Sequence, residues 1–78
     1  MRTRTFVIRT GADLGNTIAE ARAERNLTQA ELAASARVDR TYLSRLENGQ
    51  VVQQFGRALR LMRQLGLTIT ATLQVDDG

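Results

Sequence analysis

Two short helices that follow each other almost without a linker constrain the fold of this 78-residue chain more than any other feature. In the stretch LTQAELAASARVDRTYLSRLENG, Thr28 suits an N-cap, and Glu31 three residues later completes a capping box. Asp39 suits the N-cap of a second helix, which ends at Gly49. Only about two or three residues around Arg37 join these helices, so they must cross sharply, as in a helix-turn-helix unit.

Helices are also expected on both sides of this unit. The preceding helix runs from Thr10, as its N-cap, to Asn26, which suits a left-handed C-terminal position. The following helix runs from near Gln54 to Gly66, with apolar residues close to a 3.6-residue period at Phe55, Leu59, Met62 and Leu65. We expect Phe55 and Met62 to lie in the core and not around a cofactor.

Two terminal segments have the composition of strands. Residues 67–75 alternate strictly between apolar residues and Thr or Gln, which predicts a β-strand. Residues 3–9 are rich in β-branched residues and fit a second strand. A lone strand cannot satisfy its backbone. Residues 67–75 must therefore pair with residues 3–9 of the same chain, with their copy in a second chain, or with both.

The composition argues against an enzyme and for a nucleic-acid partner. The chain has no Cys and no His, so we expect no catalytic residues, no metal site and no cofactor. All eleven basic residues are Arg, and two of the eight acids, Asp76 and Asp77, lie in the last three residues. A small basic domain of this kind favours nucleic acid. Because no segment has the length of an apolar membrane span or the pattern of a signal peptide, we expect a cytoplasmic, nucleoid-associated protein.

The second helix of the unit has a polar face suited to reading base edges. Leu43 and Leu46 point inward, which leaves Tyr42 at one flank. The outer face carries side chains that can hydrogen-bond to bases: Arg40, Thr41, Ser44 and Arg45. Arg binds guanine O6 and N7 with two hydrogen bonds, and Thr and Ser contact several bases. The first turn of such a helix is the part that enters the major groove.

The stretch LTQAELAASARVDRTYLSRLENG resembles the helix-turn-helix of the Cro and phage-repressor (XRE) family, with a match over roughly residues 14–49. The resemblance implies a mainly α, lambda-repressor-like bundle of four to five helices that binds palindromic double-stranded DNA as a homodimer. It implies base contacts from Arg40, Thr41, Ser44 and Arg45. It also implies a phosphate contact near Asn48 and an ion pair between Arg22 and Glu47. Gln29 is expected to bond a phosphate and to brace the recognition helix. With the helix N-terminus and the flanking side chains included, we expect phosphate contacts from Thr28, Gln29, Arg37, Tyr42 and Asn48.

The C-terminal stretch LRLMRQLGLTITATLQV is similar to that of HipB-type antitoxins, in which a helix ending in LGL runs into a strand. That similarity implies a repressor of its own operon that neutralises a HipA-like Ser/Thr kinase toxin. It also implies an intersubunit β-sheet, whose dimer strand presents Leu67, Ile69, Ala71, Leu73 and Val75. We expect residues 1–78 to form a single DNA-binding domain, with dimerisation strands at 3–9 and 67–75.

Other readings remain open at this stage. The charged face of residues 40–45 could simply be solvated, Gln29 could be an exposed first-turn residue, and Arg22 and Glu47 could be unrelated surface charges. Three arginines of the last helix are either solvated or a surface for an acidic partner: Arg57, Arg60 and Arg63. Three near the N-terminus could touch phosphates: Arg2, Arg4 and Arg9. The chain could also be a free-standing phage-type repressor without a toxin, or a protein-interaction module.

Arg37 is the one residue that does not suit its place. Members of the resembled family usually carry Gly there, which fits a left-handed turn, and a non-Gly residue in that conformation costs about 1–2 kcal/mol. Either the turn is strained, or it has another geometry, or Arg37 offsets the cost by reaching a phosphate.

Overall fold

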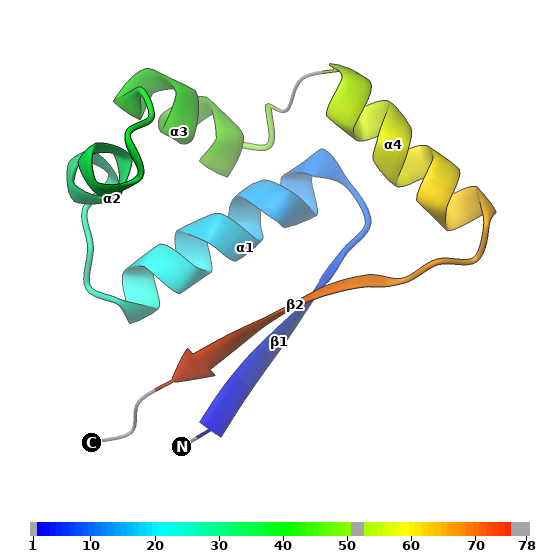
Figure 1. Cartoon of the computed structure of the whole chain (residues 1–78), viewed down its shortest axis with the longest axis horizontal. Helices are drawn as coiled ribbons and strands as arrows, with labels where there is room; N and C mark the ends of the chain where they lie inside the picture. The colour runs from blue at the N-terminus through cyan, green and yellow to red at the C-terminus, as the bar shows by residue number, and fades with distance from the viewer. Residues whose placement is uncertain (1, 51–52, 76–78) are drawn as a thin grey trace.

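Four helices and a two-stranded sheet make up the part of the chain that the computed structural model describes, residues 2–50 and 53–75 (Figure 1). The elements follow the order β1 (Arg2–Ile8), α1 (Gly11–Glu24), α2 (Gln29–Ala36), α3 (Arg40–Glu47), α4 (Gln53–Gln64) and β2 (Ile69–Val75). The mainly helical fold expected from the sequence is confirmed. The acidic residues 76 and 77 lie outside the described residues.

Side-chain caps begin the first three helices, as the sequence predicts. Thr10 caps α1 in a capping box with Asp13. Thr28 caps α2 in the same way: its Oγ1 accepts a hydrogen bond from the Glu31 N–H at 3.0 Å. The Thr28 N–H donates to Glu31 Oε1 at 2.8 Å, and this bond lowers the pKa of Glu31. Asp39 caps α3 by accepting from the N–H of residue 41 at 2.8 Å. Each cap satisfies N–H groups that the helix itself leaves unpaired.

The strands β1 and β2 pair antiparallel within one chain, from Ile8 opposite Ile69 to Arg2 opposite Val75. This is one of the pairings that the sequence left open. The sheet lies under α1, and the two strands cross beneath that helix (Figure 1). Ile8 and Val75 are buried on the inner face. The other predicted dimer-strand residues on this face, half-buried in the single chain, are Ile69, Ala71 and Leu73.

Leu67 was expected in the strand, and that prediction is wrong. The strand begins at Ile69. The Leu67 N–H donates to the Met62 carbonyl at 2.9 Å, and Gly66 between them has a φ of 75°. Leu67 thus closes the C-terminus of α4 in the manner of a Schellman motif. The alternating sequence pattern begins at residue 67, before the strand, because Leu67 belongs to the C-terminal cap of α4.

The expectation that Phe55 and Met62 lie in the core is also wrong. Their exposed fractions are 43% and 38%, and of the described α4 residues only Leu59 is buried. The helix contacts the rest of the chain mainly through α1, along one side (Figure 1). Its apolar arc is therefore wider than the surface that α1 covers. Leu61 and Leu65 on the outer side are 66% and 75% exposed.

A close crossing between α1 and α3 holds the helix-turn-helix unit to the rest of the domain. Gly15, in the middle of α1, is buried where this helix meets the C-terminal end of α3. A Cβ atom at this position would lie 2.0 Å from the Leu46 carbonyl oxygen and 3.1 Å from the Glu47 backbone. No prediction from the sequence concerned Gly15. A glycine inside an otherwise regular helix is the signal that would have found it.

Candidate nucleic-acid interface

The turn between α2 and α3 sets the angle at which α3 projects from the domain. Arg37 has φ 59° and ψ 42°, so it is left-handed, and the other geometry that the sequence left open for this turn is excluded. Its N–H donates to the Ala34 carbonyl at 3.2 Å, and the Val38 N–H donates to the Ala33 carbonyl at 3.0 Å. These bonds close the end of α2 and leave the Arg37 side chain exposed.

We expect Arg37→Gly to raise the free energy of unfolding by about 0.5–1 kcal/mol. Glycine has no Cβ and so removes the steric strain of the left-handed conformation. Its greater conformational entropy in the unfolded chain offsets part of this gain. Urea unfolding followed by circular dichroism measures the change. Unaltered operator affinity in the same variant would show that Arg37 does not contact DNA, whereas a loss would show that the arginine offsets its strain at a phosphate.

The four side chains expected to contact bases lie together around one hollow. Arg40, Thr41, Ser44 and Arg45 of α3 line it, and Gln29 of α2 completes it; its volume is about 370 Å³. Among the described residues, neither Arg40 nor Arg45 forms an ion pair. No acidic residue lines the hollow itself.

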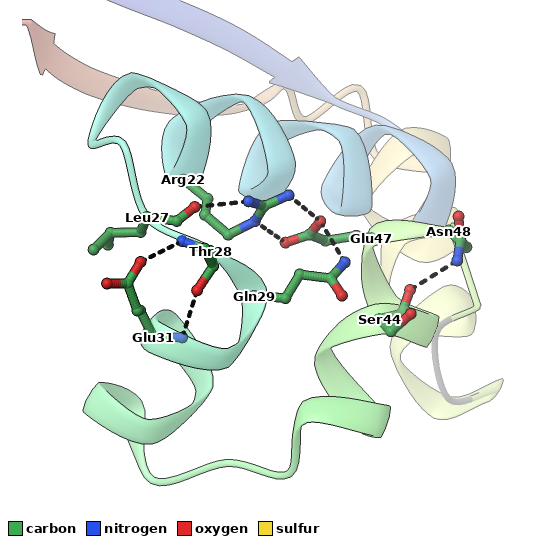
Figure 2. A network of polar contacts seen from close by, with 8 residues as sticks. All are labelled: Arg22, Leu27, Thr28, Gln29, Glu31, Ser44, Glu47 and Asn48. Carbon is green, nitrogen blue, oxygen red and sulfur yellow. Dashed lines mark hydrogen bonds and ion pairs between the residues drawn. The ribbon is translucent and has the colours of Figure 1, made fainter.

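A hydrogen-bond network fixes α3 beneath this hollow (Figure 2). Glu47, at the end of α3, accepts from Arg22 Nε at 2.7 Å and from Arg22 Nη2 at 3.0 Å. The Gln29 Nε2 donates to the same carboxylate at 3.0 Å. Arg22 Nη1 donates to the Leu27 carbonyl at 2.7 Å. One carboxylate thus joins α1, the start of α2 and the end of α3, and orients Gln29 toward α3.

The environment of Glu47 keeps it charged. The Glu47 side chain is 6% exposed and that of Arg22 is 21% exposed. Hydrogen bonding from Arg22 lowers the pKa of Glu47, and this effect outweighs burial, which alone would raise it. The same pair raises the pKa of Arg22. The double donation from one guanidinium to one carboxylate also restricts rotation of α3 relative to α1.

The remaining candidate phosphate contacts do not line the hollow and lie at three places on α2 and α3. Thr28 is at the start of α2, where its Oγ1 already accepts the capping bond. Tyr42 is on the flank of α3 and is half exposed. Asn48 caps the end of α3, and its Nδ2 donates to the Ser44 carbonyl at 3.0 Å (Figure 2). Its side-chain amide is therefore partly engaged within the helix.

Two sets of contacts that hold α1 to its neighbouring segments were not predicted from the sequence. The bond from Arg22 to the Leu27 carbonyl depends on the path of the loop between α1 and α2 and has no sequence signal. Arg4 of β1 pairs with Glu20 at 3.4 Å and with Glu24 at 3.2 Å, which ties the sheet to α1. Arg4 was considered as a phosphate contact; in the structure it faces these carboxylates.

Metal sites and membrane spans are two further features that residues 2–50 and 53–75 could contain. No set of three or more potential metal-binding side chains comes together in that part of the chain. None of its helices combines the length and the apolarity that a membrane span needs.

Known proteins share the helix-turn-helix segment of this chain. The helix-turn-helix family model matches residues 18–71. The uncharacterized HTH-type transcriptional regulator y4mF of Sinorhizobium fredii (strain NBRC 101917 / NGR234) is 39% identical over 62 residues, which cover 80% of this chain and 82% of that protein. No solved structure gives a significant match. The chain therefore belongs to the XRE-type helix-turn-helix family of DNA-binding transcription regulators.

Proposed function

We propose that this protein is a sequence-specific repressor that binds a palindromic operator as a homodimer. The hollow lined by α3 and Gln29 is the observation that carries the proposal. Its two arginines are exposed and lack ion-pair partners among the described residues, as side chains that bind guanine must be before DNA arrives. Thr41 and Ser44 between them can contact several bases, and the Thr methyl suits thymine.

Phosphate contacts would position α3 in the major groove. The N-terminus of α2 presents backbone N–H groups and the positive end of its dipole beside Gln29. The other side chains proposed to reach phosphates are exposed: Thr28, Arg37, Tyr42 and Asn48. Such contacts fix register without reading sequence, and they make binding depend steeply on salt.

A second copy of the chain would complete the hydrophobic core. No described residue is less than 2% exposed. Along α4 and at its C-terminal end, away from the arginines of the helix, apolar side chains remain in solvent: Phe55, Met62, Leu65 and Leu67. Several exposed large apolar side chains on one short segment favour an interaction surface. Each strand of the β1–β2 sheet also has one edge without a strand partner in the described part of the chain, so an intersubunit sheet can add to the same interface.

Repression would follow from occlusion of the promoter. Two α3 helices of a dimer enter successive major grooves about 34 Å apart. RNA polymerase and the dimer then compete for one stretch of DNA. Footprinting on the chain's own upstream region tests the dimer directly, because two protected half-sites about one helical turn apart are expected. A single protected half-site would contradict the dimeric mode of binding.

We expect Arg40→Ala to weaken operator binding by about 1–3 kcal/mol, with the loss concentrated at one G·C pair. Arg40 lies in the first turn of α3, the part that reaches base edges. Gel shifts on the operator and on single-base variants measure both affinity and selectivity. Arg25→Ala is the matched control: it removes the same charge, but Arg25 donates to the Gln74 carbonyl on the sheet side of α1. Equal losses in the two variants would mean that Arg40 contributes only general charge.

An antitoxin role is a second, finer candidate. It is supported by the order of α4, its LGL end and β2, the pattern in which the chain is similar to HipB-type antitoxins. On this proposal the repressor also neutralises a HipA-like Ser/Thr kinase toxin. A kinase-like reading frame beside the gene favours it, and its absence favours a free-standing phage-type repressor. If the protein retarded no fragment of its own promoter, a protein-interaction module would be the better description.

A further inference from the structure

One side of α4 carries a row of three arginines, and α4 itself has no acid to balance them. Arg57, Arg60 and Arg63 follow at three-residue spacing, and the helix from Gln53 to Gln64 contains no Asp or Glu. In residues 2–50 and 53–75, none of these three forms an ion pair. Arginine rows on exposed helices are usually balanced by carboxylates at neighbouring turns. In α4 no carboxylate of the helix neutralises the three arginines.

The arginine row lies between two adjoining hollows. One, of about 320 Å³, also involves Arg9 and Gly11 at the junction of β1 and α1. The other, of about 430 Å³, is lined in addition by Leu61 and Gln64. Arg63 Nη1 donates to the Arg9 carbonyl, which holds α4 against the junction. We call the surface formed by Arg9, Arg57, Arg60, Arg63 and Leu61 the arginine trough.

The arginine trough is separate from the recognition face. The helix α4 lies at the opposite end of the molecule from α2, and α1 runs between them (Figure 1). The hollow of α3 shares no lining residue with the trough. The trough therefore offers a second binding surface on the same domain.

We propose that the arginine trough binds an acidic segment of a partner protein that also carries apolar side chains. Guanidinium groups bind carboxylates with paired hydrogen bonds, and several in a row match a segment with successive acids. Leu61, 66% exposed within the trough, offers apolar contact that a phosphate backbone would not use. A second copy of the same face is a poor occupant, because two arginine rows would meet and repel each other.

The proposal does not depend on operator binding, and fluorescence anisotropy tests it. The probe is a short fluorescein-labelled peptide of alternating Glu and Leu, with a Gln–Leu peptide as the neutral control and non-operator duplex DNA as the third ligand. Arg60→Glu should weaken binding of the acidic peptide by about tenfold or more, because it replaces attraction with repulsion. Leu61→Ser should weaken it several-fold without a change in net charge. Arg25→Glu, with the same charge change elsewhere, should have little effect.

Each other result overturns the proposal. If Arg60→Glu lowers the affinity for duplex DNA as much as for the peptide, the row is a phosphate contact. If Arg25→Glu matches Arg60→Glu, the attraction comes from net charge alone. If the wild-type protein binds the acidic peptide no better than the Gln–Leu peptide, the row is only a solvated face. Circular dichroism of each variant checks that it is folded, and Arg60 and Leu61 are both exposed, so neither substitution disturbs the core.

Discussion

Glu47→Ala should lower the free energy of unfolding by about 3 kcal/mol, measured by urea denaturation. The substitution removes a nearly buried carboxylate that accepts three hydrogen bonds and leaves the Arg22 guanidinium without its counter-charge. Removal of one partner from a buried pair typically costs 3–5 kcal/mol, and the partial exposure of Arg22 places this pair at the lower end. Operator affinity should fall as well, because Gln29 and the end of α3 lose their shared anchor.

Two variants separate the charge from the packing. In Glu47→Gln, the stability should no longer depend on this group's ionisation. In the wild-type protein the pKa of Glu47 is lower in the folded state than in the unfolded state. The ionised carboxylate therefore stabilises the fold fully at a pH above the unfolded-state pKa, and this stabilisation is lost as the pH falls through the folded-state pKa. The double variant Arg22→Met/Glu47→Leu should recover part of the loss, since it leaves no unpaired buried charge. If Glu47→Ala were as stable as the wild type at pH 7, the network would not hold α3.

Gly15→Ala should be strongly destabilising, by about 2–3 kcal/mol. In an exposed helix the same change stabilises by about 1 kcal/mol, because alanine is the better helix former. Here the new methyl would lie 2.0 Å from the Leu46 carbonyl oxygen, a backbone atom that moves only with the helix. The α1–α3 contact must therefore open, and the recognition helix must tilt.

Gly56→Ala is the matched control for this prediction. It makes the same change within α4, where an added Cβ meets nothing within 4 Å. We expect Gly56→Ala to stabilise the domain by up to about 1 kcal/mol. Opposite signs for the two variants in thermal or urea unfolding would separate packing from helix propensity. Stabilisation by Gly15→Ala would mean that α1 and α3 lie farther apart than the structure shows.

The parts of the fold that local chemistry controls could be predicted from the sequence. The caps at Thr10, Thr28 and Asp39 and the left-handed residue at Asn26 depend on a few neighbouring residues, and all were found where expected. The exposure of Phe55 was mispredicted because apolar periodicity shows which face a helix can bury, but not how much of it a small domain covers.

In the candidate site, too, features set by neighbouring residues could be predicted, and features set by the packing of distant segments could not. The grouping of Arg40, Thr41, Ser44 and Arg45 follows from helix period alone once α3 is placed, and their contacts with bases remain a proposal. The close approach at Gly15 and the bond from Arg22 to the Leu27 carbonyl depend on how distant segments pack, so periodicity could not reveal them.

The pairing of β1 with β2 has a consequence for how the chain folds. It brings Arg2 opposite Val75, so the sheet closes a loop that contains nearly the whole domain, whereas each helix start is set by residues three or four positions apart. Closure of a long loop costs chain entropy before any contact compensates it. We expect the capped helices to form early and the sheet to form last. Amide protons of β1 and β2 should then exchange faster than those of α1.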